Sequence, residues 1–137
     1  MRGAQRRGDL IAWALPYLVK KIIIVTVIKS KIKHLPAAAK TTISSIASGY
    51  KPERIIVYGS FARGDHHQGS DLDLLVIKNT SERFADRIEH VLEYCPGGIA
   101  VEPLVYTEKE IAEMATKGNS FLESALEEGI VVYEQKS

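Results

Sequence analysis

Two short apolar runs near the middle of the chain constrain its fold most strongly. Residues 54–58 (RIIVY) are mostly β-branched, and residues 71–77 (DLDLLVI) carry apolar side chains on both faces of an extended chain. Such runs are typical of buried strands. Two further runs of the same character cover residues 99–106 and 130–133. The sequence therefore predicts four strands.

Helical patterns lie before and between these runs. Apolar residues spaced by three and four predict helices over residues 37–48 and 81–94, with Gly49 as the C-cap of the first and Ser81 as the N-cap of the second. Two more helices are expected near residues 107–115, opened by the capping box Thr107-x-x-Glu110, and over residues 120–128. This alternation predicts an α/β (α+β) fold in which helices flank the sheet.

Composition supports one globular domain. The chain has 137 residues, of which 45% are hydrophobic and 26% are charged, and these values exclude a disordered or low-complexity protein. Its one cysteine, Cys95, cannot form an internal disulfide and offers no cysteine cluster for zinc. We therefore expect a cytoplasmic protein.

The first 35 residues differ from the rest in charge. Residues 1–40 hold nine Lys or Arg and one acidic residue, a net charge of +8, whereas residues 41–137 have a net charge of −7. We predict that residues 1–35 form a basic and apolar extension of uncertain role, and that residues 36–137 form the domain. Clusters of lysine usually form a solvated face, so nucleic acid is not an expected partner. If the chain does bind nucleic acid, this basic segment is the expected contact.

An apolar stretch within the extension, residues 10–28, raises the question of a membrane span. Lys20 and Lys21 lie in its middle, and each would cost about 2.5–3.5 kcal/mol at a bilayer centre. The pieces on either side are too short to cross a membrane. The sequence therefore predicts no membrane association.

Asp71 and Asp73 are the first candidate functional residues. They stand two residues apart at the start of a predicted strand, so both carboxylates leave the same face. Aspartate is depleted in strands, and two neighbouring carboxylates repel each other without a cation. This pair is therefore predicted to bind one or two divalent ions.

Gly59, Ser60 and Arg63 follow the preceding strand. Glycine permits close approach of the backbone, and the amides of a helix start together with a serine hydroxyl can bind phosphate oxygens. Arg63 can add a charge-assisted contact to the same phosphates. We predict a phosphate-binding turn beside the two aspartates.

Glu102 is the only acidic residue in the apolar run 99–106. An acid in a buried strand is uncommon unless it is paired or binds a ligand, so Glu102 is the expected third carboxylate of the site. It would bind a metal ion or accept the proton of an attacking hydroxyl. Pro103 lacks a backbone donor, which indicates an edge or bulged position.

This order of Gly-Ser, ten residues, Asp-x-Asp and an acid on a later strand resembles the DNA polymerase β-type nucleotidyltransferase superfamily. Within it, the chain is similar to the minimal nucleotidyltransferases (MNT), the antitoxins of HEPN–MNT toxin–antitoxin modules. The resemblance covers roughly residues 37–134. It implies a mixed sheet, two Mg²⁺ ions, ATP as the donor, and transfer of AMP to a tyrosine of a HEPN-type toxin.

By the same resemblance, Gly59 and Ser60 would hold the triphosphate, with Arg63 assisting. Asp71 and Asp73 would bind both metal ions, and Glu102 would complete the catalytic site. The chain departs from the family pattern in having Glu102 where Asp is common, followed by Pro103. Either departure can misplace the third ligand.

Two other functions stay open. A module of the same fold can neutralise a partner by occlusion, with little or no catalysis. A small-molecule nucleotidyltransferase is less favoured, because only three residues follow Glu134 and no helical acceptor domain is visible, although a homo- or hetero-oligomer can supply one. His66, His67 and Asp65 are expected to be solvated loop residues, and Tyr58 is expected to lie in the core.

Overall fold

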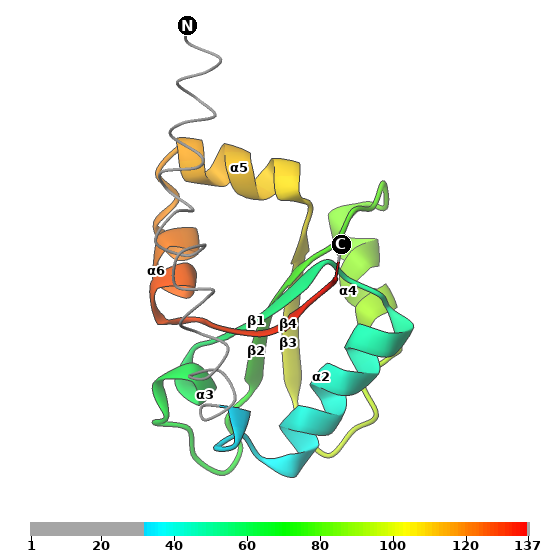
Figure 1. Cartoon of the computed structure of the whole chain (residues 1–137), viewed down its shortest axis with the longest axis vertical. Coiled ribbons are helices and arrows are strands. Elements are labelled where there is room, and N and C mark those ends of the chain that lie inside the picture. The colour runs from blue at the N-terminus through cyan, green and yellow to red at the C-terminus, as the bar shows by residue number, and fades with distance from the viewer. Residues whose placement is uncertain (1–31, 137) are drawn as a thin grey trace, which may run out of the picture.

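A computed structural model describes residues 32–136 of the protein (Figure 1). This part of the chain contains five helices and four strands in the order α2 (Ala37–Gly49), β1 (Arg54–Tyr58), α3 (Ser60–Arg63), β2 (Leu72–Ile77), α4 (Phe84–Leu92), β3 (Val101–Tyr106), α5 (Glu108–Thr116), α6 (Ser120–Glu128) and β4 (Ile130–Glu134). The α/β fold and the four strands expected from the sequence are confirmed.

The four strands form one mixed sheet with the order β3-β2-β1-β4. Strand β1 pairs antiparallel with both β2 and β4, whereas β2 and β3 are parallel. Parallel neighbours need a crossover connection, and α4 provides it. Strand β3 therefore lies at an edge of the sheet, as Pro103 indicated.

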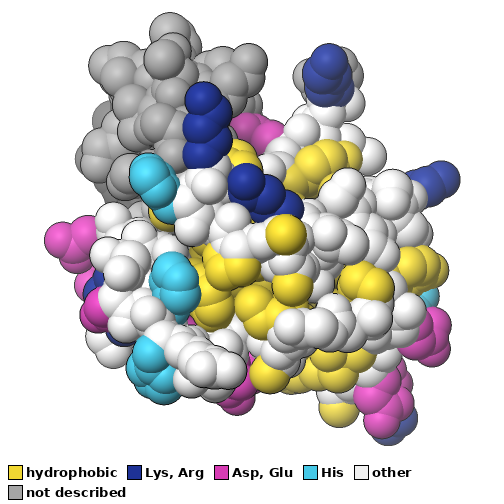
Figure 2. All heavy atoms as spheres, turned by 90° about the horizontal axis from the view of Figure 1, so that it is seen from below, with side chains coloured by type: hydrophobic (Ala, Val, Ile, Leu, Met, Phe, Trp, Pro, Cys, Tyr) yellow, Lys and Arg dark blue, Asp and Glu magenta, His cyan; other side chains and the backbone are white. Residues whose placement is uncertain are grey.

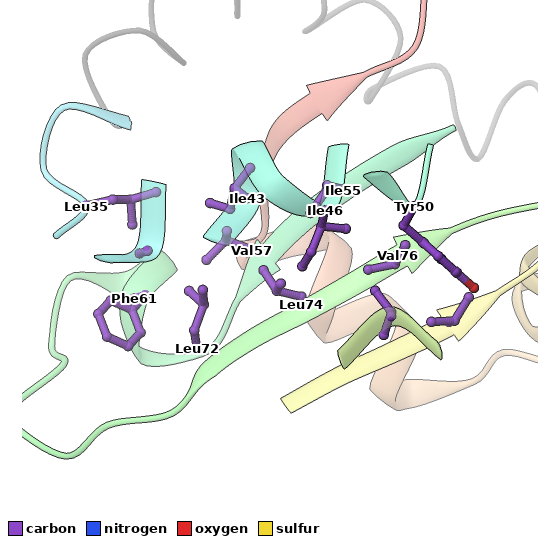
Figure 3. Close-up of a cluster of buried hydrophobic side chains, with 13 residues drawn as sticks. Leu35, Ile43, Ile46, Tyr50, Ile55, Val57, Phe61, Leu72, Leu74 and Val76 are labelled. Carbon is purple, nitrogen blue, oxygen red and sulfur yellow. The ribbon is translucent and has the colours of Figure 1, made fainter. Parts of the chain in front are cut away.

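Helices cover both faces of this sheet. Helices α2 and α4 lie on one side, and α5 and α6 lie on the other (Figure 1). The larger core fills the α2/α4 side, where Ile43 and Ile46 of α2 pack with alternate residues of β1 and β2 such as Val57 and Leu74 (Figure 3). The smaller core lies between the opposite face and helices α5 and α6, and its buried members are Ile56, Leu75, Ile77, Ile111 and Leu122.

The helix ends differ in part from the prediction. The capping box of Thr107 and Glu110 is present as expected. Gly49 is the last residue of α2 and not its cap, and a side chain there would collide with the ring of Tyr94. Helix α4 begins after Arg83 with no side-chain cap, so the prediction that Ser81 caps it is wrong. Thr80, not Ser81, accepts a backbone hydrogen bond in this segment, from the amide of Glu82 at 3.1 Å.

The predictions for the apolar and basic stretch before residue 32 lie outside the described residues. Leu35, on the extension side of the predicted boundary, packs in the larger core with an exposed fraction of 5%. Within residues 32–136, no helix has the length and apolar character needed to cross a membrane. On the face seen from below, hydrophobic side chains lie across the centre, and the acidic side chains visible in this view lie toward its edge (Figure 2).

Candidate active site

Three neighbouring strands place polar side chains in one row on the α5/α6 face of the sheet. The register pairs Tyr58 of β1 with Asp73 of β2, and Asp73 with Glu102 of β3. Asp71 precedes β2 by one residue and shares the face of Asp73 because it lies two positions away. The structure thus brings together all three carboxylates that the sequence singled out, in a pocket of about 390 Å³ that they line with Ser60 and Arg63.

The expectation that Glu102 lies in a buried strand is wrong. Glu102 is exposed, although the next residue, Pro103, is buried. Because β3 is an edge strand, only β2 flanks it, and this outer position of the row stays open to solvent. The burial argument for a functional role therefore fails, and Glu102 remains a candidate because of its place beside the two aspartates.

Mutual repulsion makes the carboxylates of Asp73 and Glu102 harder to ionise. Burial, followed by the negative charge of Asp71, raises the pKa of Asp73, and nearby Arg63 offsets this only in part. A hydrogen bond with Asp71 and the charges of Asp71 and Asp73 raise the pKa of Glu102. Protonation is one way to relieve such repulsion, and a bound cation is another.

The donor set fits magnesium when substrate phosphates share in its coordination. Carboxylate oxygens are hard ligands, and Mg²⁺ is usually held by one or two of them together with waters and nucleotide phosphates. Within residues 32–136, no three His, Cys, Asp or Glu side chains are arranged as a complete metal site. Asp71 and Asp73 are therefore the residues that would hold an ion brought in with a nucleotide.

The turn at Gly59 lies directly against this cluster. Gly59 precedes α3 with φ 73° and ψ −151°, a backbone conformation that residues other than glycine rarely adopt. A Cβ atom there would collide with the carboxylate of Asp73. The backbone of the predicted phosphate-binding turn thus lies against the predicted metal ligand Asp73, with no room for a side chain at Gly59.

Arg63 is held by two carboxylates. Its Nε donates to Asp65 at 3.1 Å, and its Nη1 donates to both oxygens of Glu128 at 3.3 Å. The Glu128 carboxylate also accepts from the backbone N–H of Gly59 at 3.0 Å. Asp65 is an exposed loop residue, as the sequence suggested, and it is also paired with Arg63. Glu128 was not predicted as a site residue at all.

An aromatic pair forms the other wall of the site. The rings of Tyr58 and Phe121 meet edge to face with centroids 5.5 Å apart, and both line a second pocket of about 400 Å³ with Gly59, Ser60, Arg63 and Glu128. Burial, together with the charges of Asp73 and Glu102, raises the pKa of Tyr58 to about 12. Tyr58 is half-buried at the margin of the smaller core, so it lies closer to the site than the sequence suggested.

The two adjacent histidines have separate partners. The ring of His66 stacks on Phe61 at 4.3 Å between centroids, whereas Nδ1 of His67 lies 2.8 Å from the carbonyl oxygen of Gln68. The two rings therefore have different neighbours. His67 nevertheless lines the pocket of the three carboxylates.

Comparisons with known proteins agree with this geometry. The family model described as "Polymerase beta, Nucleotidyltransferase" matches residues 41–137. A protein of Methanocaldococcus jannaschii named "Putative protein adenylyltransferase" is 28% identical over 103 residues, which are 70% of this chain and 95% of that protein. A crystal structure described as "a putative nucleotidyltransferase from Sulfolobus solfataricus" has a TM-score of 0.52 at 24% identity, covering 79% of this chain and 86% of that one. The last likeness supports the fold.

Proposed function

Because the chain belongs to the polymerase beta nucleotidyltransferase family, we propose that it transfers AMP from ATP to a hydroxyl group of a partner protein. Nucleotidyl transfer follows from the family, and the resemblance stated from the motif at residues 59–73 is confirmed at that level. The protein acceptor is supported by the name of the M. jannaschii relative, which is that of a protein adenylyltransferase.

One observation carries the proposal. The Gly59–Ser60 turn and the carboxylates of Asp71, Asp73 and Glu102 meet at one end of three adjacent strands. A phosphate-binding backbone and a set of metal-binding oxygens are what nucleotidyl transfer requires. Within residues 32–136 the two pockets that adjoin this turn share Ser60, Arg63 and Asp73, so they lie side by side.

The chain's own residues have separate tasks in the proposed reaction. Mg²⁺, two ions by family resemblance, would neutralise the phosphate oxygens when held at Asp71 and Asp73. Ser60 and Arg63 would orient the triphosphate. Glu102, which lines the pocket beside Asp71 and Asp73, can receive the proton of the acceptor hydroxyl. The hydroxyl oxygen bonds to the α-phosphorus, the bond from that phosphorus to the bridging oxygen breaks, and pyrophosphate leaves.

We further propose that the acceptor is a tyrosine of a HEPN-type toxin in the cytoplasm, and that modification makes this chain an antitoxin. The exposed position of Glu102 supports an acceptor on a separate protein, because the third carboxylate is open to a docked surface. Homo- or hetero-oligomers are compatible with this arrangement.

The first experiment combines the purified full chain, ATP labelled at the α-phosphate, Mg²⁺ and the product of the adjacent gene. We expect label on the partner protein, and we expect the Asp71→Asn/Asp73→Asn variant to lower the transfer rate by at least about 1,000-fold. Mass analysis of the labelled protein then identifies the acceptor residue. The Asp86→Asn variant, altered on the surface of α4, is the matched control and should transfer at the normal rate.

The outcomes separate the competing functions. Label that disappears in the double variant, while the variant still binds the partner, supports protein adenylylation. Neutralisation of the partner by the double variant as efficiently as by the wild type would favour occlusion. Label on an added small alcohol or aminoglycoside, and none on protein, would favour a small-molecule nucleotidyltransferase.

A further inference from the structure

Glu128 joins the far helix of the fold to the phosphate-binding turn. It is the last residue of α6, and it contacts Gly59 and Arg63, which are 69 and 65 residues away in the sequence. One of its oxygens accepts from both the Gly59 N–H and the Arg63 guanidinium, and the other accepts from Arg63 alone. A single carboxylate thus fixes both phosphate-binding elements predicted from the sequence.

The end of α6 that carries Glu128 is closely packed. A Cβ atom at the next residue, Gly129, would lie 2.7 Å from Ile56 Cγ2 and would collide with the carbonyl oxygen of Ala125. Glycine at this position therefore lets the helix end rest directly on β1. Glu128 is the last residue of a helix, and the next residue packs against β1. Glu128 therefore contacts Gly59 from a packed helix end and not from a loop.

The same contact constrains Asp73 indirectly. The Gly59 backbone touches the Asp73 carboxylate so closely that it leaves no room for a methyl group. A shift of the Gly59 peptide would therefore also change the space available to a metal-binding carboxylate. Small displacements of this kind are costly in active sites, because the reacting groups must be held within fractions of an ångström.

The arrangement leaves Arg63 able to bind phosphate. Its Nε and Nη1 atoms donate to Asp65 and Glu128, whereas Nη2 has no hydrogen bond to residues 32–136. The guanidinium has five donors in a rigid planar group, so two anchored nitrogens fix the direction of the third. Glu128 therefore orients both the Arg63 guanidinium and the Gly59 N–H.

We propose that Glu128 is a positioning residue for the nucleotide, which holds the Gly59 amide and the Arg63 guanidinium in the geometry that receives the triphosphate. This inference rests on the proposed nucleotidyl transfer and adds a residue to it. Glu128 is not one of the carboxylates assigned above to the metal ions or the proton, so its effect is assigned to its contacts with Gly59 and Arg63.

The test compares three variants of the full chain: Glu128→Ala, Glu128→Gln and Glu127→Ala. The glutamine retains an oxygen that can accept from the Gly59 N–H, whereas alanine removes both contacts. Glu127 is the exposed preceding residue of α6 and is the matched control. Calorimetry with a non-hydrolysable ATP analogue and Mg²⁺ measures the Kd, and nuclear magnetic resonance follows the Gly59 amide.

We expect Glu128→Ala to weaken binding of the analogue by about 10- to 100-fold, the loss typical of charge-assisted hydrogen bonds. Glu128→Gln should stay within about fivefold of the wild type, and Glu127→Ala should not change the Kd. The Gly59 amide should exchange faster with solvent in Glu128→Ala than in Glu128→Gln. Retention of the wild-type thermal midpoint by Glu128→Ala would assign its loss of binding to positioning and not to folding.

Several results would overturn the inference. Unchanged binding of the ATP analogue by Glu128→Ala would mean that the carboxylate has no effect on that binding. Tighter binding would mean that the carboxylate competes with the phosphates for Gly59 and Arg63. Equal losses in the alanine and glutamine variants, with the Gly59 amide unaltered, would exclude positioning through that amide. In both cases the wild type still binds the analogue, so the proposed transferase function survives. Absence of binding by the wild type itself would instead contradict the proposed function, and the role of Glu128 with it.

Discussion

At the residue scale, Asp73 carries a negative charge in an environment that disfavours it. Burial and the charge of Asp71 raise the pKa of Asp73. In the folded state its carboxyl therefore binds a proton more tightly than in the unfolded state, and the ionised form lowers stability at neutral pH. This cost disappears as the pH falls through the raised pKa toward about 4, the ordinary value of an aspartate.

We accordingly expect Asp73→Asn to raise the thermal midpoint by about 2–5 °C at neutral pH without divalent cations. The gain should shrink in acid, because the wild-type carboxyl is then protonated. Saturating Mg²⁺ should also reduce it, because the ion stabilises the wild type more than the variant. Calorimetric scans at several pH values measure both effects. A midpoint lowered by Asp73→Asn at neutral pH would show that the carboxylate is stabilising without metal.

At the scale of elements, Arg87 connects three parts of the fold. It is a buried residue of α4, and its guanidinium donates to the carbonyl oxygens of Glu82 and Val105 and, at 2.7 Å, to the carboxylate of Glu110. Burial alone would raise the pKa of Glu110, but the hydrogen bonds from Arg87 and the Thr107 amide outweigh it and lower that pKa. The capping box of α5 is thus tied to the crossover helix.

Replacing Arg87 by Ala should lower the free energy of unfolding by about 2–3 kcal/mol, because one buried carbonyl group, one partly buried carbonyl group and one carboxylate lose their donor. The control is Arg83→Ala, which removes an ion pair with Asp86 on the exposed face of the same region and should change stability by less than about 0.5 kcal/mol. Denaturant titration measures both.

The pH dependence provides a second check on Arg87. Because the folded pKa of Glu110 is lowered, the stability from this pair is present at neutral pH and is lost as the pH falls through that pKa. The difference in free energy of unfolding between the wild type and Arg87→Ala should therefore become smaller below about pH 4. If this difference stays constant down to about pH 3, the lost stability comes from packing and not from the ion pair.

The elements also show what a sequence can reveal. Strands β1 and β2, the Thr107–Glu110 capping box and the pairing of Asp71 with Asp73 follow from local spacing, because strand and helix periods fix which side chains share a face. The missing donor of Pro103 indicated an edge or a bulged position, and the structure has the edge position. Local features of this kind need no knowledge of distant contacts.

Sequence reasoning failed where distant segments meet. The exposure of Glu102 depends on sheet order, which no local pattern encodes. Glu128 lies 69 residues from Gly59, so no motif spacing links the two. The one local signal was the predicted helix over residues 120–128, whose end agrees with the last residue of α6. That prediction did not show which residues Glu128 contacts.

At the scale of the whole molecule, the site carries a strong excess of negative charge. Five carboxylates line the two pockets at the Gly59 turn: Asp65, Asp71, Asp73, Glu102 and Glu128. Within residues 32–136, Arg63 is the one Lys or Arg residue that lines these pockets. A triphosphate is also strongly negative, so it meets net repulsion in this pocket unless cations accompany it. Binding of ATP should therefore depend on the divalent ion and not merely be improved by it.

Thermal unfolding of the full chain tests this dependence. ATP with Mg²⁺ at 100 times its Kd should stabilise the protein by about 2.7 kcal/mol, which corresponds to a rise of about 10 °C in the midpoint for a domain of this size. ATP with a chelator in place of Mg²⁺ should leave the midpoint unchanged, because the repulsion is then uncompensated. The Asp71→Asn/Asp73→Asn variant should lose the gain in Mg²⁺. An equal rise with the chelator present would mean that Arg63 and the Gly59 turn bind the triphosphate by themselves, and that the carboxylates serve only the transfer step.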